Sequence, residues 1–219
     1  MAGRDLESRI LRRTTRAGLA PGPETIAALA AYVALLARWN ERINLTALPL
    51  TPATDAAIDR LIVEPVLASR RVRPSDRLCI DVGTGGGSPA IPLKIMAPSL
   101  RMVLVEVKAR KAAFLEEACR ALALDGVEVE VSRFEELLTH VDLHEAADLV
   151  TMRAVKADHG FWRGTQALLK PGGHVLWFRS SSPSSAGPEV PPPLMVTGED
   201  LLGGVGNVLT VVTRGNRGD

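Results

Sequence analysis

A short β-branched run that opens directly onto a cluster of glycines constrains the fold more than any other feature. Residues 78–82 predict a buried strand, and the loop Gly83-Thr84-Gly85-Gly86-Gly87 follows without a break. Further strands are predicted over 102–106, 127–131, 148–152 and 174–178, with helices over 89–97, 109–123, 134–139 and 158–169 between them. This alternation predicts an α/β fold, a doubly wound and mostly parallel sheet with helices on both faces.

The residues before this region predict an N-terminal extension, and the residues after it predict a hairpin at the edge of the sheet. Residues 1–75 predict an N-terminal helical unit, with one long helix over 24–45 that Pro49 and Pro52 end, and a further helix over 53–69. Residues 76–219 would form the sheet domain. Within it, 180–193 is a Ser/Pro-rich linker, and 194–197 with 208–213 predict a closing hairpin at the sheet edge.

Composition limits the class of protein. The chain has 219 residues, 46% of them hydrophobic and 23% charged, which suits one globular domain with an appendage. Its longest apolar stretch has 12 residues, whereas a membrane-spanning helix needs about 20, and no secretory signal is legible. Cys79 and Cys119 form no metal-binding pair and predict buried, reduced thiols. We expect a cytoplasmic monomer without a metal.

The glycine loop predicts a ligand site. In a doubly wound sheet a loop after the first strand lies at the carboxyl edge, where such folds bind ligands. Glycines allow positive φ and let a ligand approach the backbone. Asp81 lies just before the loop and Glu106 ends the next strand, where an acid can accept hydrogen bonds from ribose hydroxyls. A purely architectural turn does not explain Glu106, so we expect a nucleoside derivative.

Two cofactors compete for this loop. Residues 85–90 satisfy the G-x-G-x-x-A pattern of NAD sites. Asp81, Gly83, Gly85 and Gly87 instead form the D-x-G-x-G-x-G pattern of S-adenosylmethionine-dependent methyltransferases. Because no partner for hydride transfer is visible downstream, we favour the methyl donor.

Positive charge is concentrated in the first third of the chain, although the net charge is only +1. Residues 1–75 hold eleven Lys/Arg against seven Asp/Glu, and four arginines at helical spacing predict a cationic stripe that could bind RNA phosphates or be a solvated face: Arg9, Arg12, Arg13 and Arg16. A second basic group is predicted near the carboxyl end of the second strand: Arg101, Lys108, Arg110 and Lys111. Trp39 could stack on a base but is more typical of a core position, and Asn44 is typical of a helix cap.

The loop and four other segments resemble one family. Residues 81–93 are similar to the cofactor loop of the bacterial 16S ribosomal RNA guanine-N7 methyltransferases (RsmG, also called glucose-inhibited division protein B). The resemblance covers roughly residues 30–178, and its other segments follow in the same order: Arg38-Trp39-Asn40 with Asn44-Leu45-Thr46, Val105-Glu106 with Arg110-Lys111 and Phe114-Leu115, residues 132–136, and residues 148–154.

The resemblance implies a Rossmann-like methyltransferase fold with an N-terminal helical extension, S-adenosylmethionine as donor, and a guanine of small-subunit ribosomal RNA as substrate, free or within a ribonucleoprotein particle. The glycines of the loop would hold the methionine part, Glu106 the ribose, and Phe134 with Glu135 the adenine. Arg153 would orient the target guanine, unless it bridges a strand end to a helix carboxylate. Arg110 and Lys111, with the arginine stripe, would contact RNA.

The chain also departs from this family. Residues 61–65 read Leu-Ile-Val-Glu-Pro where the family usually has His-x-x-Asp-Ser, and 180–193 replace a lysine-glycine turn and helix. Both changes affect the substrate side more than the donor side. A methyltransferase of a small molecule or protein on the same fold, and a non-catalytic module that binds the cofactor or RNA, are therefore the alternatives.

Overall fold

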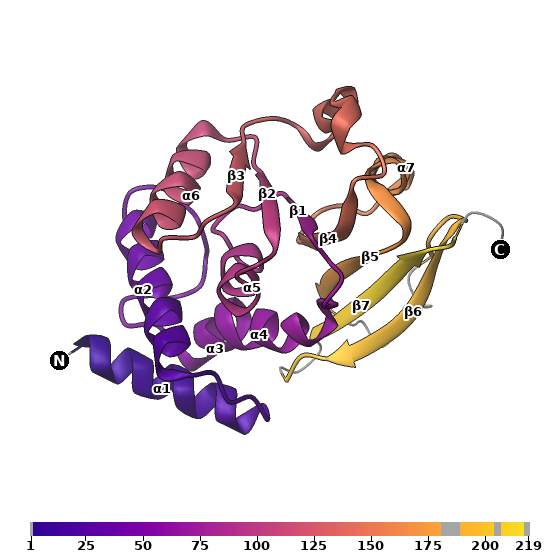
Figure 1. The fold of residues 1–219 in the computed structure, drawn as a ribbon. Coiled ribbons are helices and arrows are strands. Elements are labelled where there is room, and N and C mark those ends of the chain that lie inside the picture. Colours follow the sequence, from indigo (N-terminus) through magenta and orange to yellow (C-terminus); the bar gives the residue numbers. More distant parts are fainter. Residues whose placement is uncertain (1, 181–188, 204–206, 217–219) are drawn as a thin grey trace.

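A seven-stranded sheet forms the centre of the molecule (Figure 1). The computed structural model describes residues 2–180, 189–203 and 207–216. The strand order is β3-β2-β1-β4-β5-β7-β6, in which β1 to β5 run parallel and β7 runs antiparallel to both of its neighbours. The strand bounds are β1 Leu78–Val82, β2 Arg101–Val105, β3 Val127–Glu130, β4 Ala147–Arg153, β5 Leu169–Ser180, β6 Leu194–Leu201 and β7 Asn207–Arg214. The predicted α/β sheet and its edge hairpin are confirmed.

Both faces of the sheet are covered. Side chains alternate along a strand, so Cys79 and Leu149 belong to one apolar cluster and Ile80 and Val150 to the other. The first cluster packs against helices α5 (Ala90–Met96) and α6 (Ala109–Ala121), and the second against α7 (His159–Leu168) and the 3-10 helix η3 (Phe134–Thr139), with η4 (Val141–Leu143) after it. The helix predicted over 134–139 is present and is a 3-10 helix.

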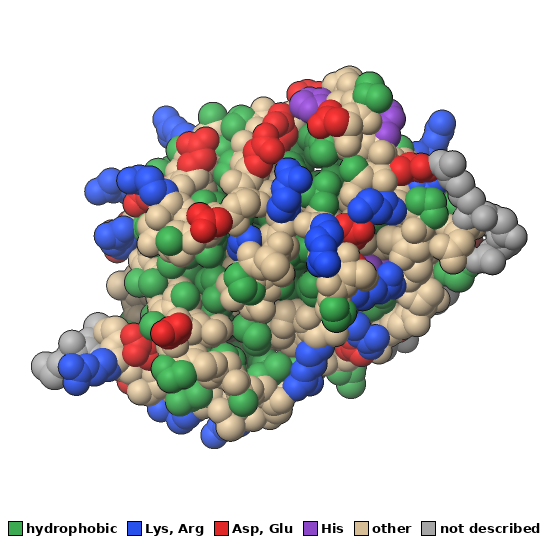
Figure 2. All heavy atoms as spheres, viewed as in Figure 1, with side chains coloured by type: hydrophobic (Ala, Val, Ile, Leu, Met, Phe, Trp, Pro, Cys, Tyr) green, Lys and Arg blue, Asp and Glu red, His purple; other side chains and the backbone are tan. Residues whose placement is uncertain are grey.

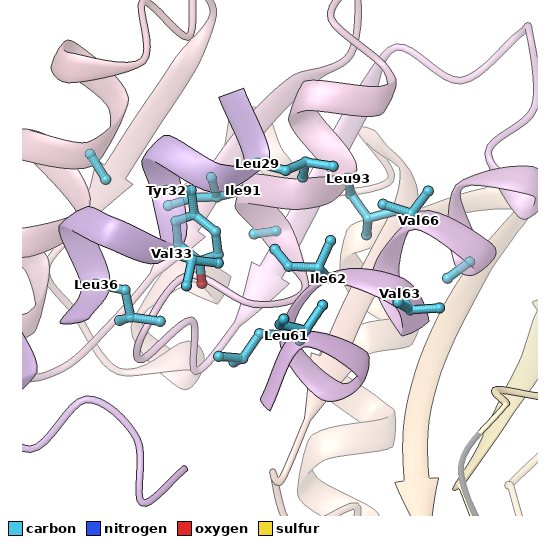
Figure 3. Close-up of a cluster of buried hydrophobic side chains, with 14 of the residues drawn as sticks. Leu29, Tyr32, Val33, Leu36, Leu61, Ile62, Val63, Val66, Ile91 and Leu93 are labelled. Atoms are coloured by element: carbon cyan, nitrogen blue, oxygen red, sulfur yellow. The ribbon is translucent and has the colours of Figure 1, made fainter. Parts of the chain in front are cut away.

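The first 75 residues are helical and share the first of these two clusters. They form α1 (Ala2–Arg16), α2 (Pro23–Asn40), α3 (Asp55–Ile58), the π-helix η1 (Asp59–Val63), α4 (Glu64–Ala68) and the 3-10 helix η2 (Ser69–Arg71). Figure 3 shows Tyr32 and Leu36 of α2 with Ile62 of η1 and Ile91 and Leu93 of α5 in one buried group. A division into two domains at residue 75 stays a prediction.

Helix α2 ends earlier than predicted. It ends at Asn40 rather than residue 45, because the Asn40 side-chain oxygen accepts hydrogen bonds from the backbone N–H groups of Leu45 and Thr46, both at 2.9 Å. Asn40, not Asn44, thus organises this end, and Pro49 lies well beyond it. The chain that follows turns back toward the glycine loop.

The predicted helix over 53–69 contains a π-helical turn. Pro65 has no N–H, so the carbonyl group of Leu61 loses its usual α-helical donor. The N–H of Glu64 donates to the carbonyl group of Asp59, five residues before it, so the carbonyl group of Arg60 also lacks its α-helical donor. The irregularity therefore has a local cause in the sequence, and it frees two acceptors for other segments.

Two further observations concern the exterior. No helix within the described ranges is both long enough and apolar enough to span a bilayer. On the face shown in Figure 2, basic side chains are interspersed with acidic ones. Residues 181–188, the centre of the predicted linker, lie outside the described residues; Ser180 before them ends β5.

Candidate active site

The glycine loop after β1 has a backbone that requires glycine. Gly83, Gly85 and Gly87 have φ values of +69°, +57° and +88°. A Cβ on Gly87 would lie 2.6 Å from Cδ1 of Ile91, and one on Gly83 would lie 3.0 Å from Cγ2 of Val155. The loop can keep this shape only with small residues at these positions.

The N-terminal helices hold the same loop from behind. Tyr32 is fully buried, and its hydroxyl donates to the carbonyl oxygen of Gly86 at 2.7 Å. A Cβ on Gly86 would lie 3.2 Å from the carbonyl oxygen of Leu45 and 3.3 Å from Cδ1 of Leu36. The loop is therefore packed directly between the sheet and the helical unit.

Glu106 lies beside the loop, as its position after β2 suggested. One carboxylate oxygen accepts from the backbone N–H of Gly85 and the other from the N–H of Lys108, both at 2.9 Å. Each oxygen has a second lone pair, so the fixed carboxylate can still accept a hydroxyl donor. The structure brings Glu106 and the glycines together.

Asp81 lies beneath the loop. The Thr151 hydroxyl donates to one of its carboxylate oxygens, while the other has no hydrogen-bond partner among the residues described. Burial raises the pKa of Asp81 to about 6. Asp81 is not among the residues that line the cleft described next, and its contact with a cofactor stays a prediction.

Two adjoining hollows form a cleft around Glu106. The first has a volume of about 260 Å³ and is mainly apolar, with Phe134 and Glu135 in its wall. The second has a volume of about 510 Å³ and is lined by the glycine loop, residues 45–48, 60–61 and 153–155, and Lys111. Gly83, Glu106 and Val155 belong to both hollows.

This cleft fits S-adenosylmethionine on chemical grounds. The first hollow offers an apolar wall with an aromatic ring, since Phe134 is held by stacking on Phe161 with ring centroids 5.2 Å apart. Glu106 lies at the junction with carboxylate oxygens of the kind that accept hydroxyl donors, and the glycine loop lines the hollow beside it. The predicted set of Gly83, Gly85, Glu106 and Phe134 thus lies along one cleft.

Arg153 ends β4 and is held by an ion pair. Its Nη2 donates to Glu64 at 2.9 Å, its Nη1 donates to the carbonyl oxygen of Arg60, and its guanidinium lies 4.4 Å from the centre of the Phe178 ring. Burial lowers the pKa of Arg153 to about 10. The residue lines the second hollow, but its contacts are those of an arginine that bridges a strand end to a helix carboxylate.

Glu64 lines neither hollow, but it is the carboxylate partner of Arg153, a role that was not predicted from the sequence. It is 1% exposed and accepts hydrogen bonds from Arg153, from Arg60 at 3.1 Å and from the Asn207 amide at 2.7 Å. Burial raises its pKa despite the two arginines. The available signal was its place in residues 61–65, where the chain departs from the family pattern but keeps an acid.

The four predicted arginines of α1 divide into two pairs. Arg9 contacts Asp55 at 2.6 Å, and Arg13 bonds to both Asp55 and Asp59, so these two join α1 to α3 and the π-helix. Arg12 and Arg16 are exposed. A single four-residue stripe facing solvent is therefore wrong, and RNA contact by these residues stays a prediction.

The second basic group is also divided. Lys111 lines the second hollow and Arg110 beside it is exposed. Arg101 is the first residue of β2, at the opposite end of the strand from Glu106, so its predicted place at the carboxyl end is wrong.

Trp39 packs edge-on against Phe114 at 5.8 Å and borders the core, which confirms the core interpretation.

Comparisons with known proteins agree with this geometry. The family model described as rRNA small subunit methyltransferase G (GidB) matches residues 25–187. Two relatives carry the name ribosomal RNA small subunit methyltransferase G. One, from Xanthomonas oryzae pv. oryzae, is 39% identical over 72% of this chain and 70% of its own length. The other, from Stenotrophomonas maltophilia, is 38% identical over 73% of this chain and 71% of its own length.

Solved structures share the fold at low identity. A SAM-dependent methyltransferase from Aquifex aeolicus has a TM-score of 0.53 at 17% identity, over 72% of this chain and 92% of its own. TrmN from Thermus thermophilus has a TM-score of 0.52 at 20% identity, over 68% of this chain and 48% of its own. The chain therefore belongs to the rRNA small subunit methyltransferase G (GidB) family and has an S-adenosylmethionine-dependent methyltransferase fold.

Proposed function

We propose that this protein transfers the methyl group of S-adenosylmethionine to N7 of a guanine in small-subunit ribosomal RNA. The observation that carries the proposal is the cleft itself. Glu106 lies where the apolar hollow that holds Phe134 meets the glycine loop, and the larger, more polar second hollow adjoins it. Family membership supplies the reaction class, and it favours the methyl donor over NAD.

The donor would be held along this cleft. Gly83, Gly85 and Gly87 would accommodate its methionine part, Glu106 would accept from the ribose hydroxyls, and Phe134 with Glu135 would border the adenine. When bound, S-adenosylmethionine supplies an electrophilic methyl group. The residues that hold the donor do not need to transfer a proton.

Guanine N7 suits such a site chemically. It has a lone pair and no proton, so its attack on a methyl group needs no general base. The work left to the protein is alignment, which can lower a barrier by up to about 7–11 kcal/mol. Asp81, whose pKa is raised to about 6, would be the obvious candidate for a base, but it lies beneath the loop and not in the cleft wall.

The proposal also covers the form of the RNA substrate and the location and oligomeric state of the protein. The substrate is ribosomal RNA of the small subunit, free or within a ribonucleoprotein particle, and the protein acts on it as a cytoplasmic monomer. We expect four basic residues to contact the RNA: Arg12, Arg16 and Arg110, which are exposed, and Lys111, which lies at the cleft wall.

The test is methylation of RNA from subunits that lack the modification. Purified protein and S-adenosylmethionine should produce 7-methylguanosine at one position, measured by mass spectrometry of nuclease digests. Glu106→Gln should weaken donor binding in calorimetry, while the exposed Glu136→Gln on η3 serves as a matched control. Methyl transfer only to a protein or small molecule, or NAD binding without a response to the donor, would refute the proposal.

A further inference from the structure

The second hollow contains two guanidinium groups, and they differ in what remains available to a ligand. Arg153 has a side chain only 10% exposed. Its Nη1 and Nη2 bond to the Arg60 carbonyl and to Glu64, and the ring of Phe178 lies against its guanidinium. A group enclosed in this way is poorly placed to bind RNA.

The contacts of Arg153 have a structural purpose that follows from Pro65. The N–H of Glu64 donates to Asp59 rather than to Arg60, and Pro65 has no N–H for Leu61, so the carbonyl groups of Arg60 and Leu61 need donors from elsewhere. Arg153 donates to the first carbonyl, and the hydroxyl of Ser88 after the glycine loop donates to the second at 3.0 Å. Arg153 therefore attaches the π-helix to the end of β4, and Ser88 attaches it to the glycine loop. π-Helical turns are frequent at functional sites.

Arg60 lies in the first turn of this π-helix and is differently placed. Its side chain is 26% exposed and it lines the second hollow. Only its Nη1 is bonded, to Glu64, at 3.1 and 3.4 Å; within the described part of the chain its Nε and Nη2 have no hydrogen-bond partner. Three N–H bonds are thus available.

The net charge around Arg60 is positive, which favours the binding of an anion. Glu64 is a single carboxylate shared by Arg60 and Arg153, so this group of three carries a net positive charge. Lys111 adds a further cation to the same wall, and Glu106, whose oxygens already accept two backbone N–H groups, is the acid there. An arginine fork with free N–H bonds matches the geometry of a phosphate.

We infer that Arg60, rather than Arg153, binds the RNA, through a backbone phosphate beside the target guanine. The inference rests on the proposed function. A phosphate contact leaves N7 free for attack, and it fixes the nucleotide's position without reading its base. Arg153 is then a positioning residue that acts through the π-helix.

The experiment compares Arg60→Gln, Arg60→Lys and Arg153→Lys with the wild type. The exposed Arg120→Gln, on the last turn of α6 and nine residues after Lys111, is the matched control. Each protein is assayed for the KM of unmethylated small-subunit RNA and for RNA affinity across a salt series, with donor affinity by calorimetry and melting temperature measured in parallel.

Arg60→Gln should raise the KM for RNA and its Kd roughly tenfold, equivalent to about 1.4 kcal/mol, with donor affinity unchanged. Its salt dependence should lose roughly 0.7–0.9 of a unit of slope, the loss expected for one phosphate contact. Arg60→Lys should restore the slope, since the charge is kept. Arg153→Lys should lower the melting temperature and donor affinity but leave the salt slope unchanged.

Different results would refute the proposed function and the inference about Arg60. If the wild-type protein methylates no guanine, the proposed function is wrong. If the wild type methylates RNA and Arg60→Gln keeps both its RNA affinity and its salt slope, only the inference is wrong. A loss of salt slope in Arg153→Lys, with a wild-type slope in Arg60→Gln, would return the phosphate contact to Arg153.

Discussion

Replacing Asp81 with asparagine should change how stability depends on pH. Asp81 is 1% exposed at the end of β1, and its carboxyl is surrounded by core with one hydroxyl partner, Thr151. Burial therefore favours the neutral form in the folded protein. Asparagine keeps the oxygen that accepts from Thr151 but cannot ionise, so the variant isolates the cost of the charge.

The size of the effect follows from the pKa. A shift from 3.8 to about 6 corresponds to about 3 kcal/mol between the protonation states. The stabilising contribution of the neutral carboxyl is fully present below about pH 4 and is lost as the pH rises through about 6. The free energy of unfolding of Asp81→Asn, minus that of the wild type, should therefore increase by about 3 kcal/mol between pH 4 and pH 8.

The assay is urea unfolding of the ligand-free protein at intervals across this range. Asp148→Asn is the control of opposite sign: desolvation by burial raises the pKa of Asp148, but the hydrogen bonds from Lys170 and from the backbone of Arg77 and Leu78 together outweigh it and lower the pKa below its ordinary value. Its contribution is present at neutral pH and lost as the pH falls below about 4. Parallel pH curves for Asp81→Asn and wild type would refute the burial argument.

Three further changes have defined outcomes. Glu64→Ala leaves Arg153 buried without its carboxylate and should cost about 3–5 kcal/mol, a fall in melting temperature of about 6–20 °C; a loss under about 1 kcal/mol in urea unfolding would contradict the pairing. Gly87→Ala places a Cβ 2.6 Å from a neighbouring side chain at φ +88°, so donor affinity and stability should both fall in calorimetry and melting; unchanged values would show that the loop adapts. Arg12→Glu with Arg16→Glu should raise the KM for RNA at low salt without lowering the melting temperature, and an unchanged KM would make them solvated residues.

The donor side of the site could be predicted from the sequence because its signals are local. A strand, a loop that needs positive φ, and an acid at the end of the next strand are set by short segments and by the parallel order of the sheet. Glu106 and Gly85 are brought together by that order alone, since adjacent parallel strands end at the same edge.

The substrate side could not be predicted in the same way because its contacts cross the chain. Glu64 and Arg153 are far apart in sequence, and no periodicity relates them. The ion pairs of α1 left a weak signal: Asp55 and Asp59 are spaced i, i+4, as are Arg9 and Arg13, so two helices could pair these faces. The spacing of the arginines alone does not identify which acidic residues pair with them.

The N-terminal helical unit helps to fix the position of the glycine loop, although the two are far apart in the sequence. Tyr32 donates to Gly86 on one side of the loop, and Ser88 on the other side donates to Leu61. Tyr32 and Leu61 both belong to the first 75 residues. The first bond needs the Tyr32 hydroxyl and the position of α2, and the second needs only the position of the Leu61 carbonyl group in the π-helix. A change that shifts α2 or the π-helix must therefore move the glycine loop, and with it the donor, even where the altered residue contacts no ligand. The glycine loop, the wall of the second hollow and the helical unit are in this way parts of one packed unit.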